Sequence, residues 1–338
     1  MAESVKKLGL VFTAFLLIIT IVACGEDFGE DDSVIKLAQG DWESHEVHNQ
    51  IAKIIMEEGY DKDTDTVTAD TPVVTQSLKT GDLDVNVEMW SDNVETYDED
   101  LEAGEYHEIS VNFDDNAQGF YIPKYLQEEN PGLKTVQDLP EYKELFPHPE
   151  VTEWDPEEDK AIIYGGPSGF AATDFLENKF ENDDEYSELI EHFDFWPLES
   201  TATLNTTLTD AYEDEEPWVG YNWEPTWIMG KYEMVLLEDE KDYSSDTHKD
   251  GVGNLPPTRV TVVVTDGFED QHPDVHEFLS NYETSSDLTS EALAYMQDND
   301  VEAEEAARWF LEENEDLWTE WVDEDAEKAI KAALEAED

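Results

Sequence analysis

The chain carries far more negative charge than an ordinary folded protein. Its 18 Lys and Arg residues stand against 87 Asp and Glu residues, which gives a formal net charge of −69 at pH 7. In dilute salt, this self-repulsion opposes any compact state. At molar ionic strength the Debye length falls to ~3 Å, so that carboxylates spread over a surface no longer repel one another. The charge therefore predicts a halophilic protein with an acidic surface. It excludes nucleic-acid binding, which needs a basic footprint.

The apolar content is nevertheless high enough for a large core. Hydrophobic residues make up 39% of the chain and aromatic residues 11%, including ten Trp, whereas acidic disordered chains are poor in both. The length of 338 residues exceeds the usual size of one core, so two domains or two lobes are expected. Calcium binding is the alternative explanation of the acidic surface, although the sequence contains no EF-hand loop.

The N-terminus has the pattern of a targeting segment. Two lysines precede an apolar run at 8–23, which is shorter than the ~20 residues that a membrane-spanning helix needs. Residues 21–24, Ile-Val-Ala-Cys, resemble a bacterial lipobox, and Cys24 is the single cysteine of the sequence. We expect residues 1–23 to be a signal peptide and residues 24–33 to form an acidic tether behind a lipidated Cys24. An uncleaved anchor with an incidental thiol is the alternative.

Beyond residue 33, predicted strands and helices alternate. Apolar alternation and short apolar runs predict strands at 34–38, 65–69, 83–89, 119–122, 160–164, 218–221 and 259–265. Helical periodicity predicts helices over 45–58, from residue 170 after a glycine-rich turn, and from residue 273 onward. Such alternation is typical of an α/β fold.

Three tryptophans lie at or just beyond the ends of predicted strands. Trp42 stands in Gly-Asp-Trp-Glu-Ser, Trp90 ends Glu-Met-Trp, and Trp223 begins Trp-Glu-Pro-Thr-Trp. Ligands of α/β sheets bind at the carboxyl ends of strands. The cation–π attraction between a cation and one Trp face contributes ~0.5–2 kcal/mol. Several such rings can surround a quaternary ammonium group and exclude water from it. For one such Trp alone, core packing is the simpler interpretation; the three together predict an aromatic cage.

Five stretches of the sequence carry a resemblance to a known family: 40–44, 81–84 leading to Trp90, 119–123, 167–170 and 223–227. From Ile35 to its end, the chain is similar to the glycine betaine and proline betaine binding proteins of ABC importers. This resemblance implies the two-lobed type II periplasmic binding protein fold, in which each lobe is a mixed sheet flanked by helices and two crossover strands form a hinge. The expected boundaries are 34–119 for the first part of lobe one, 120–258 for lobe two and 259–338 for the return to lobe one.

The resemblance also implies roles for individual residues. In that family three Trp surround the trimethylammonium group, and the matching positions are Trp42, Trp90 and Trp223. Backbone N–H groups in the turn before a helix bind the ligand carboxylate, which corresponds to Gly169 and Phe170. A helix N-terminus does favour an anion.

Three further residues bear on which quaternary amine the site binds. Tyr121 is either a fourth wall of the cage or hinge packing. Glu95 stands where some relatives have a histidine that holds the carboxylate, and Glu224 stands where relatives often have a neutral residue. Both acidic residues are candidates for a more negative pocket. Choline, which has the same cation without the carboxylate, is therefore the alternative to glycine betaine or proline betaine.

We expect neither a metal-binding nor a catalytic role for the remaining polar groups. His45 and His48 are expected on a solvated polar helix face rather than at a metal, and the sequence shows neither a Ser-His-Asp arrangement nor a phosphate-binding loop. We therefore expect no cofactor and no enzymatic activity. The implied partners are an ABC permease with its ATPase, and the membrane through the lipid anchor. An acidic calcium-binding surface lipoprotein and a lipid-anchored hydrolase are the alternatives from other classes.

Overall fold

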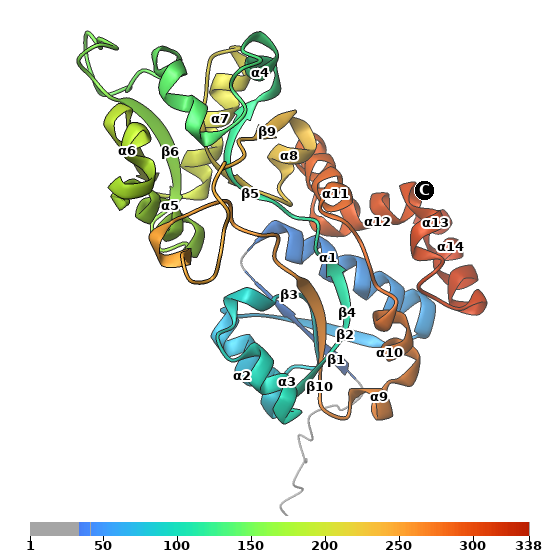
Figure 1. The fold of residues 1–338 in the computed structure, drawn as a ribbon. Helices are drawn as coiled ribbons and strands as arrows, with labels where there is room; N and C mark the ends of the chain where they lie inside the picture. Colours follow the sequence, from blue (N-terminus) through green and yellow to red (C-terminus); the bar gives the residue numbers. More distant parts are fainter. Residues whose placement is uncertain (1–33, 41, 338) are drawn as a thin grey trace, which may run out of the picture. The chain divides into compact units, whose positions relative to one another are not determined.

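The computed structural model describes residues 34–40 and 42–337 (Figure 1). Cys24, the predicted signal peptide and the predicted tether therefore lie outside the described residues. Two mixed five-stranded sheets organise the fold, with the strand orders β2-β1-β3-β10-β4 and β7-β6-β8-β5-β9. In this part of the chain, no helix combines the length and the apolar character that a membrane span requires.

The first sheet combines N-terminal strands with one strand from much later in the sequence. Its members are β1 (Val34–Gln39), β2 (Asp63–Thr68), β3 (Val85–Trp90), β4 (Tyr106–Phe113) and β10 (Val260–Thr265). β1 pairs in parallel with β2 and β3, and β10 lies antiparallel between β3 and β4. Every residue of β10 is buried, because Val262 and Val264 contribute to one core cluster and Val263 to the other.

Helices cover both faces of this sheet. The cluster that contains Val263 receives residues from α2 (Thr71–Thr80) and α3 (Tyr97–Ala103). The cluster that contains Val262 receives residues from α1 (Glu43–Ile54), from the π-helical turn Ile55–Gly59, and from the C-terminal helices α9 (Phe268–Gln271), α10 (Pro273–Ser280), α11 (Ser286–Asn299), α12 (Ala303–Glu313), α13 (Glu315–Trp318) and α14 (Glu324–Glu337). Trp318 and Trp321 belong to this core.

The second sheet is built from the middle of the chain. Its strands are β5 (Gln118–Pro123), β6 (Ala161–Pro167), β7 (Phe193–Leu198), β8 (Gly220–Trp223) and β9 (Met234–Leu236). β6 runs parallel to β7 and β8, whereas β5 is antiparallel to β8 and β9. The associated helices are α4 (Lys124–Glu129), α5 (Ala171–Glu181), α6 (Asp183–His192), α7 (Thr201–Glu213) and α8 (Trp227–Lys231), with 3-10 turns at Val136–Leu145 and His248–Asp250.

The chain passes from the first sheet to the second at 114–117 and returns at 254–259. β5 and β10, the strands of the predicted hinge, each lie wholly within one sheet, and the crossings are the segments just before them. The buried side chain of Asn116 joins the two crossings: its amide donates to the carbonyl of Thr258 at 2.6 Å and accepts from the Thr258 N–H at 2.9 Å. One asparagine thus reproduces the hydrogen bonds of a β-bridge between them.

Helices α8 and α11 provide a second connection between the two parts, and Figure 1 shows them side by side. The partly buried ring of Trp227 packs against both large core clusters. Gly230 allows the two helices to approach closely, since a Cβ atom at that position would lie 2.1 Å from the carbonyl oxygen of Ser290.

This architecture confirms the predicted α/β fold of two mixed sheets flanked by helices. The predicted strand at 34–38 is β1, and that at 259–265 is β10. The predicted helix at 45–58 is α1 with its π-helical continuation. Three strands, β4, β7 and β9, were not among those predicted.

Candidate ligand-binding site

Trp42 lies at the beginning of α1 as its N-cap residue, in an extended conformation. Its ring is 36% exposed, which is high for so large an apolar side chain. The ring covers Gly40, because a Cβ atom on that residue would lie 2.1 Å from an indole carbon. Glycine at position 40 is therefore a condition for this orientation of Trp42.

Trp90 is the last residue of β3 and is half-buried. Its ring meets Phe113 edge to face at a centroid distance of 5.9 Å. The indole N–H groups of Trp42 and Trp90 both donate to Oε1 of Glu88, at 2.8 and 3.0 Å. The structure thus brings together the two tryptophans that the sequence assigned to lobe one, and we call Trp42, Trp90 and Glu88 the first aromatic group.

Glu88 is 1% exposed and accepts a third hydrogen bond at Oε1, from the hydroxyl of Ser44 at 2.8 Å. Its other oxygen, Oε2, is buried and has no hydrogen-bond partner among the described residues. Burial raises the pKa of this carboxyl to about 7, although the hydrogen bonds from Trp90, Ser44 and Trp42 oppose the rise. The sequence prediction did not include Glu88. The signal for it was a lone carboxylate within a strand that is buried on both faces.

His45 and His48 correct the prediction of a solvated helix face, because both are 1% exposed. Nδ1 of His45 accepts from the backbone N–H of Gly40 at 2.8 Å, and Nδ1 of His48 lies 2.7 Å from the hydroxyl of Tyr282. Burial lowers the pKa of each imidazole to about 3. These histidines are therefore neutral packing groups beneath the first aromatic group. The described residues contain no group of three or more side chains suited to hold a metal.

Trp223 ends β8 in the second sheet and is half-buried. Its ring stacks on Tyr221 with centroids 5.6 Å apart, and Phe170 meets it edge to face at 6.2 Å. Phe170 is 42% exposed, so its ring, and not only its backbone, belongs to the surface beside Trp223. We call Trp223, Tyr221 and Phe170 the second aromatic group. Neither ring beside Trp223 was predicted as part of the cage.

The turn that the sequence assigned to the ligand carboxylate leads from β6 into α5. Gly169 has φ +93°, a conformation that favours glycine, and no atom lies within 4 Å of where its Cβ would be. Phe170 is the N-cap residue of α5, but its N–H donates to the carbonyl of Pro167 at 3.3 Å. The amides of 171–173, in the first turn of α5, have no preceding helical carbonyl to bind. They are better placed to receive an anion than the amide of Phe170.

Tyr121 is 2% exposed within the core of the second sheet, which leaves its ring no free face toward a ligand. Its hydroxyl donates to Oε1 of Glu224 at 3.1 Å. Glu224 is half-buried beside Trp223 in the sequence, and burial raises the pKa of its carboxyl. Glu95 is exposed between the 3-10 turn Ser91–Asn93 and α3. Glu224 thus lies next to a predicted cage residue in sequence, whereas Glu95 does not.

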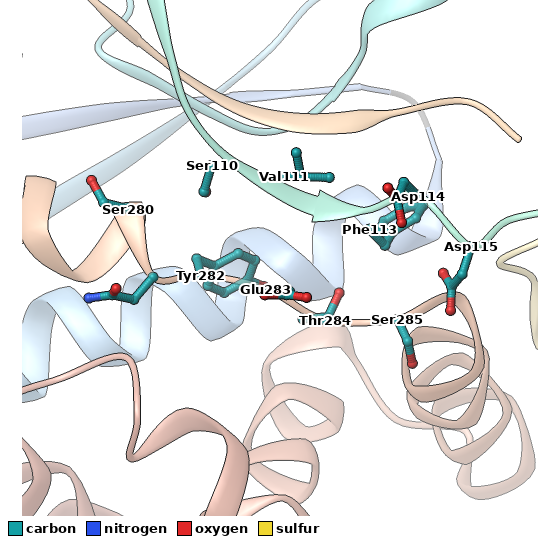
Figure 2. A pocket seen from close by; sticks show the side chains of 11 residues that line it. Ser110, Val111, Phe113, Asp114, Asp115, Ser280, Tyr282, Glu283, Thr284 and Ser285 are labelled. Atoms are coloured by element: carbon teal, nitrogen blue, oxygen red, sulfur yellow. The ribbon is translucent and has the colours of Figure 1, made fainter.

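A separate hollow of about 590 Å³ lies between the end of β4 and the connection from α10 to α11. Figure 2 shows Phe113 and Tyr282 at this hollow together with the acidic side chains of Asp114, Asp115 and Glu283. None of the three predicted cage tryptophans lines it. Phe113 contacts the ring of Trp90 and Tyr282 contacts that of His48, so the hollow shares one lining residue with the surroundings of the first aromatic group.

The sequence matches a known family over most of its length. Residues 33–313 match the family described as the substrate binding domain of ABC-type glycine betaine transport systems. The glycine betaine/carnitine transport binding protein of Listeria monocytogenes is 27% identical over 132 residues, which is 38% of this chain and 40% of the relative. That match thus spans well under two thirds of the relative's length.

Two solved structures share the fold. One is an ABC-transporter choline binding protein in complex with choline, with a TM-score of 0.60 and 19% identity over 90% of this chain and 99% of that chain. The other is the lactococcal glycine betaine binding protein in its closed, liganded conformation, with a TM-score of 0.59 and 17% identity over 86% of this chain and 100% of that chain.

Proposed function

The chain belongs to the family of substrate-binding domains of ABC-type glycine betaine transport systems, and on this premise we propose that it captures a quaternary ammonium compound, glycine betaine or choline, between its two aromatic groups. The observation that carries the proposal is the pair of indoles, Trp42 and Trp90, fixed side by side on one buried carboxylate. Membership of this family implies that the protein lies outside the cytoplasm and belongs to an importer that contains an ABC permease. We propose that the loaded form is delivered to that permease and its ATPase.

The binding mechanism follows from the distribution of the rings. Trp42 and Trp90 come from the first sheet and α1, whereas Trp223 and Phe170 come from the second sheet and α5. A ligand cation that contacts both groups is desolvated only when the two lobes approach, so the ligand itself stabilises the closed state. The segments at 114–117 and 254–259, joined through Asn116, are where we propose that the chain bends. No bond is broken in this cycle.

The choice of ligand depends on the second aromatic group. Glycine betaine would place its carboxylate at the first turn of α5, where amide N–H groups favour an anion. The carboxyl of Glu224 follows Trp223 directly and would repel that carboxylate when ionised. This residue specifically favours choline as the second candidate, because choline has a hydroxyl in place of the carboxylate.

A thermal-shift panel in molar salt tests the proposal. Glycine betaine or choline at ~100 times its dissociation constant should add roughly 2.7 kcal/mol to the stability of the folded state. Sugars and neutral amino acids should add nothing at equal concentration. Stabilisation by calcium alone would point to the surface lipoprotein alternative, and stabilisation by a sugar alone would point to a different transport substrate.

The lipid anchor is a separate proposal, because Cys24 lies outside the described residues. Cys24→Ser should abolish partitioning of the expressed protein into detergent while leaving ligand affinity unchanged, since the folded sheets begin at Val34. Detergent phase separation followed by a binding assay on both proteins measures the two effects. If Cys24→Ser partitions with detergent as the parent does, the apolar run is itself the anchor and the lipobox interpretation is wrong.

A further inference from the structure

Glu88 occupies a position that the proposed cage mechanism does not by itself require. Its backbone N–H donates to Oδ1 of Asn86 at 2.9 Å, and its side chain is buried between β3 and α1. A single oxygen, Oε1, accepts the indole N–H groups of Trp42 and Trp90 as well as the hydroxyl of Ser44. Three donors from two elements thus converge on one carboxylate oxygen, while Oε2 has no partner in the described part of the chain.

We propose that Glu88 is the positioning residue of the ligand site: it fixes Trp42 and Trp90 as one cation-binding face and supplies the counter-charge behind them. The inference rests on the proposed function and deepens it. Hydrogen bonds to an ionised acceptor are shorter and stronger than neutral ones. An anionic acceptor on the N–H edge also pushes electron density into the indole, which strengthens the attraction of its face for a cation.

The charge of Glu88 has no compensating cation in the free protein. No ion pair involves Glu88 among the described residues. The buried titratable groups on this side are Tyr282, which interacts electrostatically with Glu88, His48, which lies 2.7 Å from the Tyr282 hydroxyl, and His45, whose ring lies 5.2 Å from that of Trp42. Burial keeps both imidazoles neutral by lowering each pKa to about 3. It keeps the Tyr282 phenol neutral by raising its pKa well above the usual range. A ligand cation would therefore be the first positive charge to reach this carboxylate.

This arrangement makes cation binding dependent on pH. In the free protein the Glu88 carboxyl retains its proton up to a pKa of about 7. A bound cation favours the ionised form and lowers this pKa, so binding releases a proton just below pH 7; the affinity rises as the pH rises toward about 7 and levels off above it. If the cation lowers the pKa by about one unit, the affinity gains about tenfold between the acidic and alkaline limits. Glycine betaine and choline hold a permanent charge, so the ammonium group contributes nothing to this profile.

Glu88→Gln is the informative variant, because the glutamine amide oxygen can still accept all three hydrogen bonds but carries no charge. The probes are choline and its neutral carbon isostere 3,3-dimethylbutan-1-ol, with binding measured by calorimetry at pH 5.5 and pH 8.5. We expect Glu88→Gln to lower choline affinity about tenfold at pH 8.5 and to flatten the pH profile, while binding of the neutral isostere stays unchanged. Glu88→Ala, which also releases both indoles, should weaken binding of both probes.

Glu108→Gln is the matched control. Glu108 lies on β4, which β10 separates from β3. Its carboxylate accepts from the hydroxyl of Tyr97 and from Arg259, so the same substitution there should leave both affinities and the pH profile as in the parent. Circular dichroism establishes that each variant is folded. If Glu88→Ala does not fold, Glu88→Gln alone tests the role of Glu88. Parental choline affinity and pH profile in folded Glu88→Gln overturn the proposal for Glu88. Absence of choline and glycine betaine binding in the parent instead overturns the proposed function.

Discussion

Replacing Trp42, Trp90 or Trp223 singly by alanine is expected to weaken glycine betaine or choline binding about thirtyfold, which corresponds to the loss of ~2 kcal/mol for one desolvated ring face. Alanine leaves a hydrated gap beside the cation, whereas phenylalanine keeps a π-face with a weaker quadrupole. Phenylalanine should therefore cost less at all three positions. Calorimetric titration of the six variants in molar salt measures the series.

The hydrogen bonds of the three indoles predict different losses of affinity for the three phenylalanine variants. The indoles of Trp42 and Trp90 donate to Glu88, whereas no described residue accepts a hydrogen bond from the indole of Trp223. Trp223→Phe should therefore be the mildest of the three. Trp318→Ala is the control: Trp318 is fully buried and its indole donates to the carbonyl of Leu311 at 2.7 Å. That variant should lose stability without a selective loss of affinity, and near-parental affinity in two of the three alanine variants would show that these tryptophans are not the binding site.

Transfer from molar to millimolar salt is expected to unfold or expand the protein in the absence of any other change. The Debye length grows from ~3 Å at 1 M to ~30 Å at 0.01 M, so that the surface carboxylates begin to repel one another across the molecule. The ion pairs of the described residues cannot offset this, because even complete pairing of 18 cationic side chains leaves an excess of 69 acidic ones. A circular-dichroism titration over this range follows the transition.

The choice of salt separates screening from specific ion binding. Sodium and potassium chloride at equal ionic strength should restore the fold equally, because both screen alike. Restoration by millimolar calcium at low ionic strength would indicate specific calcium sites instead. A fold that is equally stable across the whole range would contradict the halophilic interpretation of the charge.

Much of the fold was accessible from the sequence because its strands are buried and apolar. The run at 260–264 predicts a strand in the middle of a sheet, and β10 does lie between β3 and β4. β4 and β7 escaped prediction for a physical reason: β4 contains His107, Glu108 and Asn112, and β7 contains Asp194 and Pro197. Their pairing depends on neighbours far away in sequence, which local patterning does not report.

The sequence predicts the rings of the proposed site but not the residues that support them. Trp42 and Trp90 could be assigned together from their places at strand ends, and the structure places both on Glu88. The burial of His48 could not be foreseen, since it involves Tyr282 and Thr289, more than two hundred residues later, which pack against α1. For the same reason Tyr121 could not be distinguished from a cage wall until its ring was found in the second core.

Direct calorimetric titration of the mature protein in molar salt tests whether this chain binds a quaternary ammonium ion. We expect saturable binding of glycine betaine or choline at a single site per chain, with a negative heat-capacity change from the desolvation of the rings. We also expect that glycine, which lacks the methyl groups, fails to compete. A protein that is folded by circular dichroism but gives no saturable heat with either quaternary amine would show that the chain does not bind these ligands.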